Sequence, residues 1–276
     1  MTEPRRLALL LEYDGAAYGG SQIQANAPTV QGELERAIHR LTGERVRVAM
    51  AGRTDAGVHA LGQVASFLTA SRHSPETVLR GLNFYLPADI AVRAAREAPL
   101  DLDVRRHARR REYRYVIYNA PARPVLWRGR AWHVEPPLDV AAMQAAVGAL
   151  VGRHDFAPFA GQPSRPGAST VRVLYEAAVT RRGPLVTLRL AANAFLPHQV
   201  RRTAGALVEV GRGRQDPGWF ARLLSEGAPG RAGPTAPPEG LYLVAVRYAH
   251  FSFETGDDDE DVHGEGRRDH PGLARH

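Results

Sequence analysis

The sequence predicts an α+β protein in which a largely antiparallel sheet is flanked by helices. Segments with strand-like and helix-like spacing are mixed along the chain, without the regular strand–helix alternation of a parallel barrel. Both halves of the chain contain both kinds of segment, which predicts two similar subdomains, residues 6–107 and 108–250, although no repeat is visible residue by residue. Residues 251–276 are rich in Asp and Glu, and we expect a disordered acidic tail.

Helices are predicted where apolar residues recur at three- and four-residue spacing behind a residue that can cap a helix. The clearest case begins after Thr29 and stops at Gly43. Ser74 and Asp139 are placed to cap two further helices. The predicted ranges are 30–41, 74–86, 139–150, 198–210 and 216–225.

Strands are predicted where apolar residues alternate or form a short run, at residues 6–13, 45–50, 90–97, 112–118, 171–180, 185–192 and 241–249. The strand at 45–50 leads directly into the turn at residues 52–57, so the first notable acidic residue, Asp55, is expected just beyond the end of a strand. The strand at 112–118 places Tyr113 and Tyr115 on one face, because side chains alternate across a strand.

The composition excludes several classes of function. The chain of 276 residues has no cysteine, and so it has no disulfide, thiolate metal site or cysteine nucleophile. No apolar run approaches the roughly 20 residues that span a bilayer. The N-terminal segment also lacks the pattern of a signal peptide, so we expect a cytoplasmic protein without membrane segments. His263, His270 and His276 lie in the tail without a second ligand pattern, so no metal site is expected there.

The charge points to an anionic partner. The net charge is +7 overall, and residues 1–250 hold 33 basic and 21 acidic side chains. Nucleic acid is the commonest partner for such an excess, because clustered basic side chains contact phosphates. One dense arginine series could follow a phosphate backbone, although a solvated basic surface is the alternative. This series consists of Arg105, Arg106, Arg109, Arg110 and Arg111.

The turn at residues 52–57 is the strongest candidate for chemistry. It places the guanidinium of Arg53, the hydroxyl of Thr54 and the carboxylate of Asp55 between two glycines, which permit close approach of another molecule. Asp and Thr in such turns also commonly bond to their own backbone. From the residues alone, this structural explanation is the more frequent one.

The string GRTDAGVHA at residues 52–60 resembles the signature of TruA-type tRNA pseudouridine synthases, in which the aspartate is the essential carboxylate. Further stretches similar to this family occur in the expected order, at residues 13–24, 105–115, 155–159, 193–205 and 237–243. The chain departs from the family pattern at Ser21, where a large aromatic is usual, and at Gln199, where methionine is commoner. Leu102 and Asp103 stand where phenylalanine and histidine are common.

The resemblance implies the pseudouridine synthase fold with a central basic cleft. It also implies an isomerase that converts uridine to pseudouridine at positions 38, 39 and 40 of tRNA, in the anticodon stem-loop. The reaction breaks the bond from N1 of uracil to the ribose and rejoins the base through C5, so it needs no cofactor or metal. Asp55 would be the catalytic residue, either as a nucleophile or as a group that draws a sugar proton and stabilises developing positive charge.

The resemblance assigns three further residues to substrate binding. Arg201 would reach the catalytic aspartate, Arg53 would hold the RNA strand and displace the target nucleotide, and Tyr113 would lie over the uracil with its hydroxyl near C5. Without the resemblance, a surface helix arginine, turn stabilisation and core packing are the respective alternatives. The family acts on tRNA as a homodimer, and we expect the same here.

Three other functions compete with this one. A pseudouridine synthase for another RNA would share most of these features. A catalytically silent RNA-binding protein would keep the basic surface, although Asp55, Tyr113 and Arg201 together argue against it. A glycoside hydrolase also cleaves a glycosidic bond but uses a carboxylate pair, and here one carboxylate stands in a motif.

Overall fold

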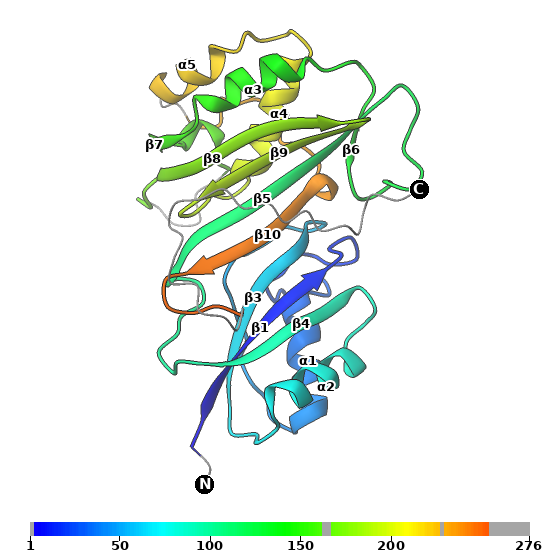
Figure 1. The fold of residues 1–276 in the computed structure, drawn as a ribbon, viewed down its shortest axis with the longest axis vertical. Helices are drawn as coiled ribbons and strands as arrows, with labels where there is room; N and C mark the ends of the chain where they lie inside the picture. The colour runs from blue at the N-terminus through cyan, green and yellow to red at the C-terminus, as the bar shows by residue number, and fades with distance from the viewer. Residues whose placement is uncertain (1–2, 162–166, 227–228, 254–276) are drawn as a thin grey trace.

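The computed structural model describes residues 3–161, 167–226 and 229–253, which form one mixed ten-stranded sheet with five α-helices (Figure 1). The strands are β1 (Arg5–Tyr13), β2 (Ala49–Met50), β3 (His59–Thr69), β4 (Ile90–Ala98), β5 (Ala108–Asn119), β6 (Trp132–Val134), β7 (Gly152–Asp155), β8 (Val171–Arg182), β9 (Leu185–Ala192) and β10 (Leu241–Tyr248). The α-helices are α1 (Val30–Thr42), α2 (Pro75–Tyr85), α3 (Val140–Gly148), α4 (Gln199–Gly211) and α5 (Trp219–Glu226). Two short 3₁₀ helices are η1 (Ala157–Phe159) and η2 (Pro238–Gly240). The predicted α+β class is therefore confirmed.

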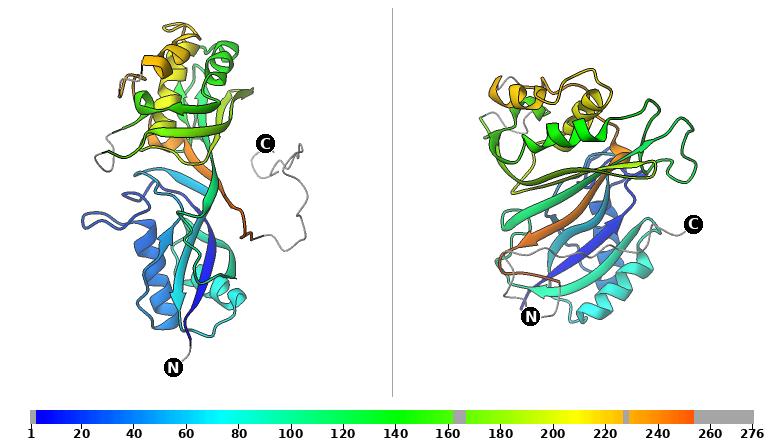
Figure 2. Two further views of the ribbon diagram at one scale, coloured as in Figure 1. Left: turned by 90° about the vertical axis from the view of Figure 1, so that its left-hand side faces the viewer. Right: turned by 45° about the horizontal axis from the view of Figure 1, so that its top comes forward.

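The sheet runs through the whole molecule in the order β4-β1-β3-β10-β5-β9-β8-β7, with β2 beside β3 and β6 beside β5. Helices α1 and α2 lie in the half that contains β1, β3 and β4, and α3, α4 and α5 lie in the half that contains β8 and β9 (Figures 1 and 2). One hydrophobic core cluster includes buried side chains from both halves, such as Leu9 of β1 and Leu188 of β9. The helices of the described residues include no segment long and apolar enough to cross a membrane.

Local capping signals in the sequence predict where several helices begin and end. The Thr29 hydroxyl accepts from the Gly32 amide at 3.2 Å, and Gly43 ends α1 in the left-handed conformation with φ of 76°. Ser74 caps α2, and Asp139 caps α3 by accepting from the Ala142 amide at 2.9 Å. These starts agree with the predictions because a cap depends on neighbouring residues alone.

Strand β10 joins the two halves. It pairs with β5 in antiparallel fashion and with β3 in parallel fashion, so the last described strand lies in the middle of the sheet (orange in Figure 1). The parallel contact is short, with Tyr242 opposite His59 and Leu243 opposite Ala60. Gly62 permits this approach, because a Cβ on Gly62 would lie 2.3 Å from the Val244 carbonyl oxygen.

The strand predicted at residues 45–50 is wrong over most of its length, since only Ala49–Met50 is a strand. Side chains of α1 satisfy the backbone there instead: Glu35 accepts from the Val48 amide at 3.0 Å, and Gln31 donates to the Val48 carbonyl at 3.0 Å. Strand β3 is absent from the sequence predictions. Nearly all of its residues are buried, so it lacks the alternation of a half-exposed strand.

The predicted division at residues 107 and 108 stays a prediction. The position falls where the link after β4 meets β5, and the sheet is continuous around it. Most of the predicted disordered tail, residues 254–276, lies outside the described residues. Its first residues do pack: Phe251 and Phe253 contact a small cluster of buried side chains that includes Leu102 and Val104.

We predict that Gly62→Ala lowers the free energy of unfolding by about 1–3 kcal/mol, the usual cost of overpacking, because the new methyl group must displace the backbone of β10. Urea denaturation measures this change. Gly148→Ala is the matched control, since an added Cβ at this helical position meets no atom within 4 Å. Equal stability of the two variants would contradict the tight contact between β3 and β10.

Candidate functional site

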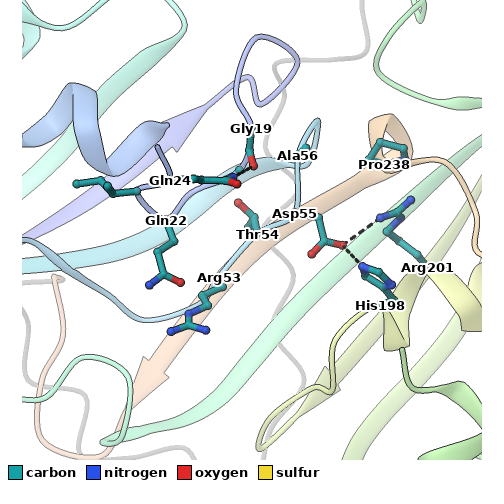
Figure 3. Close-up of a pocket in the computed structure, with 12 residues that line it drawn as sticks. Gly19, Gln22, Gln24, Arg53, Thr54, Asp55, Ala56, His198, Arg201 and Pro238 are labelled. Carbon is teal, nitrogen blue, oxygen red and sulfur yellow. Dashed lines mark hydrogen bonds and ion pairs between the residues drawn. The ribbon is translucent and has the colours of Figure 1, made fainter. Parts of the chain in front are cut away.

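Asp55 lies in the turn between β2 and β3 and lines a cavity of about 770 Å³ (Figure 3). The wall combines segments that are distant in sequence: residues 19–24, residues 53–56, the first turn of α4 and Pro238. A second cavity, of about 1360 Å³, shares Asp55 and extends to Tyr113. Its lining includes several arginines, namely Arg47, Arg53, Arg105, Arg106, Arg111, Arg172 and Arg201. The site therefore brings together both halves of the chain.

Buried polar side chains fix the start of the turn. The fully buried Gln63 amide binds both backbone groups of Gly52, accepting from its N–H at 3.2 Å and donating to its carbonyl at 2.8 Å. Arg111 donates to the Ala51 carbonyl at 3.1 Å. Both polar groups of Gly52 and the Ala51 carbonyl are thereby satisfied away from water, as buried backbone requires.

Ser21 and Thr54 hold the middle of the turn by two reciprocal hydrogen bonds. The Thr54 amide donates to the Ser21 hydroxyl at 2.8 Å, and the Ser21 amide donates to the Thr54 carbonyl at 3.1 Å. The Thr54 hydroxyl lies 2.9 Å from that of Tyr13. Thr54 therefore has a structural role, and the buried Ser21 hydroxyl bonds directly to the turn.

The Asp55 carboxylate faces two side chains from the beginning of α4 (Figure 3). Arg201 Nη1 donates to Asp55 Oδ2 at 3.0 Å, and Arg201 Nε donates to the Ala236 carbonyl at 2.8 Å. His198 Nε2 lies 3.5 Å from the same oxygen. Two nitrogen-bearing side chains therefore approach the same oxygen of Asp55. The side chain of Asp55 is still 38% exposed, so the carboxylate is accessible from the cavity.

Tyr113 of β5 is nearly buried beside the site. Its ring packs edge-to-face on Phe195, with centroids 5.0 Å apart. Burial raises the pKa of Tyr113 well above its usual range, and the negative charge of Asp55 contributes in the same direction. The hydroxyl is therefore protonated at neutral pH. Tyr115 belongs to the core, where its hydroxyl donates to the Pro237 carbonyl at 2.7 Å.

Arg53 is exposed and extends away from Asp55 along the cavity (Figure 3). Within the described part of the chain it makes no hydrogen bond or ion pair. The neighbouring arginine series divides into different roles. Arg105 and Arg106 line the larger cavity, whereas Arg110 is paired with Glu112 and Glu176.

His198 is the residue at this site that the sequence predictions missed. Its backbone has φ of 60° and ψ of 1°, and no other non-glycine residue in the described ranges has a positive φ. This left-handed conformation costs a non-glycine residue about 1–3 kcal/mol. Helical spacing gave no signal for it, because His198 precedes α4 and has a left-handed backbone.

We predict that Ser21→Ala lowers the free energy of unfolding by about 1–3 kcal/mol, because the buried Thr54 amide loses its acceptor. Ser169→Ala is the control: its hydroxyl also accepts a backbone amide, from Val171, but it is exposed to water. Thermal or urea unfolding of both variants tests this. A Ser21→Ala protein as stable as the control would show that the hydroxyl does not hold the turn.

The described residues contain no group of three or more His, Asp or Glu side chains that could hold a metal ion.

Comparison with known proteins identifies the family. A family model described as tRNA pseudouridine synthase matches residues 10–105 and 146–249. The chain is 50% identical over 264 residues to tRNA pseudouridine synthase A of Roseiflexus sp. (strain RS-1), covering 94% of this chain and 97% of that protein. It is 45% identical over 243 residues to tRNA pseudouridine synthase A of Myxococcus xanthus, covering 88% and 92%. The chain therefore belongs to the tRNA pseudouridine synthase A family, with Asp55 and Arg201 paired within its candidate site.

Proposed function

We propose that this protein isomerises uridine to pseudouridine at positions 38, 39 and 40 of tRNA, in the anticodon stem-loop, with Asp55 as the catalytic residue. The observation that carries the proposal is the Asp55 carboxylate, which faces a cavity and is held by Arg201 through one oxygen at 3.0 Å. The second support is the family itself, whose relatives are named for tRNA pseudouridine formation.

The reaction requires an ionised carboxylate in either of its possible routes. As a nucleophile, Asp55 would form a covalent bond to the sugar or the base; as a base, it would draw a proton from the sugar. In both, positive charge develops as the bond from N1 to the ribose breaks, and a fixed negative charge stabilises it. The Arg201 guanidinium bonds to Oδ2 of Asp55 and leaves the second carboxylate oxygen uncovered.

Tyr113 is suited to receive the uracil ring and to take part in the last proton transfer. Its nearly buried ring can pack on the base, and its hydroxyl is within reach of the Asp55 turn, since a Cβ on Gly52 would lie 3.6 Å from it. Because the raised pKa keeps this hydroxyl protonated, it cannot act as an anionic base. It can accept the C5 proton only if it passes its own proton on at the same time.

Arg53 and the arginines of the larger cavity are suited to hold the RNA. Taking a base out of a stem costs a few kcal/mol, and a cation in the vacated place or on the adjacent phosphates offsets this cost. Arg53 is free to do so, because it has no protein partner among the described residues. Arg105 and Arg106 extend the same basic wall.

The proposal includes a homodimer in which one tRNA contacts both subunits, in the cytoplasm where the tRNA is found. A mass measurement that gives an active, stable monomer would contradict the dimer.

Asp55→Asn should abolish modification while tRNA binding is kept. We expect pseudouridine formation to fall by more than about 10³-fold, the scale of losing a nucleophile or its activating group. Carbodiimide primer extension on unmodified tRNA, without added cofactor or metal, measures the reaction and its position. A wild type that binds tRNA and modifies nothing would favour the silent RNA-binding protein, and modification outside the anticodon arm would correct the substrate position.

Tyr113→Phe separates the ring from the hydroxyl. We expect kcat to fall by about 10²–10⁴-fold, the range of a lost acid–base group, and KM for tRNA to stay near that of the wild type because the ring remains. Steady-state kinetics on an anticodon-arm substrate measure both constants. A Phe variant with wild-type kcat would limit Tyr113 to a packing surface.

A further inference from the structure

His198 directly precedes α4, but the start of this helix does not require a histidine. The residue precedes α4 in the left-handed conformation, which favours glycine, yet it carries an imidazole. That imidazole makes no capping hydrogen bond to the helix. The Gln199 side chain bonds to the segment before the helix, accepting from the Leu196 amide at 2.8 Å. The helix start therefore does not account for a histidine at this position.

Gly161 leaves room for the His198 ring in its observed position. A Cβ on Gly161 would lie 2.9 Å from His198 Nδ1 and 3.2 Å from Cγ, closer than real Cβ atoms normally approach. The backbone of Gly161 also donates to the Pro197 carbonyl at 2.8 Å, which keeps the two segments together. The ring is consequently held with one edge against Gly161 and Nε2 toward Asp55 (Figure 3).

His198 and Arg201 face the same oxygen of Asp55. Nε2 of His198 lies 3.5 Å from Oδ2, and Nη1 of Arg201 lies 3.0 Å from it. Oδ1 accepts no hydrogen bond from any residue that the structure describes. The carboxylate is thus contacted on one side by two nitrogen groups, and its other oxygen is left for a bound molecule.

We infer that His198 is a positioning residue that, together with Arg201, fixes the orientation of the Asp55 carboxylate so that Oδ1 faces the nucleotide. The inference rests on the proposed role of Asp55. Catalysis is sensitive to such orientation, because a reacting group displaced by about 1 Å can lose on the order of 10²-fold in rate.

Two substitutions test this inference: one removes the imidazole, and the other displaces it. His198→Gly removes the imidazole and suits the left-handed backbone, so the fold should be at least as stable. Gly161→Ala keeps the imidazole and displaces it. We expect each substitution to lower kcat by about 10–100-fold. KM for tRNA and the melting temperature should stay near their wild-type values. Gly148→Ala, whose methyl group enters open space, is the control with wild-type kinetics.

The double variant His198→Gly/Gly161→Ala makes the test specific. If the methyl group acts only through the ring, the double variant is no slower than His198→Gly alone. Wild-type kcat in His198→Gly, a change confined to KM, or an additive loss in the double variant would each overturn the inference. Asp55→Asn is measured in parallel: if it stays active, the proposed function fails, whereas an inactive Asp55→Asn beside a fully active His198→Gly rejects the positioning role alone.

Discussion

The ion pair between Asp55 and Arg201 depends on structure at both of its ends, because the two residues are 146 positions apart. Asp55 is held by the N-terminal half through a bridge to Gly20 and the bonds of Ser21 to Thr54. Arg201 belongs to α4, in the other half. Their 3.0 Å separation therefore requires the two halves to keep a fixed relation, and the continuous sheet provides it. Strand β10 is the part of the sheet that pairs with both halves.

Several polar side chains around the site bind backbone groups of the protein. They include Ser21, Gln199 and Asp103. Ser21 accepts from Thr54, Gln199 accepts from the Leu196 amide, and Asp103 accepts from two amides at 2.9 and 3.0 Å. The bonds to Asp103, led by that from the Arg106 amide, hold its pKa below the usual range. All three residues line the larger cavity, so these bonds hold the backbone of its wall.

Sequence reasoning succeeded where the determinants are local and failed where they are distant. Thr29 and Ser74 begin helices because of their immediate neighbours, and both were predicted. The failed strand at residues 45–50 depends on side chains of α1. The placement of Asp55 beside Arg201 was predicted through family resemblance and not from spacing. His198 was missed because its direction follows from a left-handed backbone and a contact with Gly161, neither of which the sequence displays.

The side chain of Arg201 divides its hydrogen bonds between two acceptors, and this leaves part of the Asp55 carboxylate available. A guanidinium can bind both oxygens of a carboxylate at once, and such a bidentate pair would leave Asp55 with neither oxygen free. Here Nε binds the Ala236 carbonyl at 2.8 Å, and Nη1 binds Asp55 through one oxygen, Oδ2. Arg201 thus binds Asp55 through Oδ2, and Oδ1 accepts no hydrogen bond from any residue that the structure describes. This arrangement serves a nucleophile and a proton acceptor equally well, because both need a lone pair that no protein group occupies.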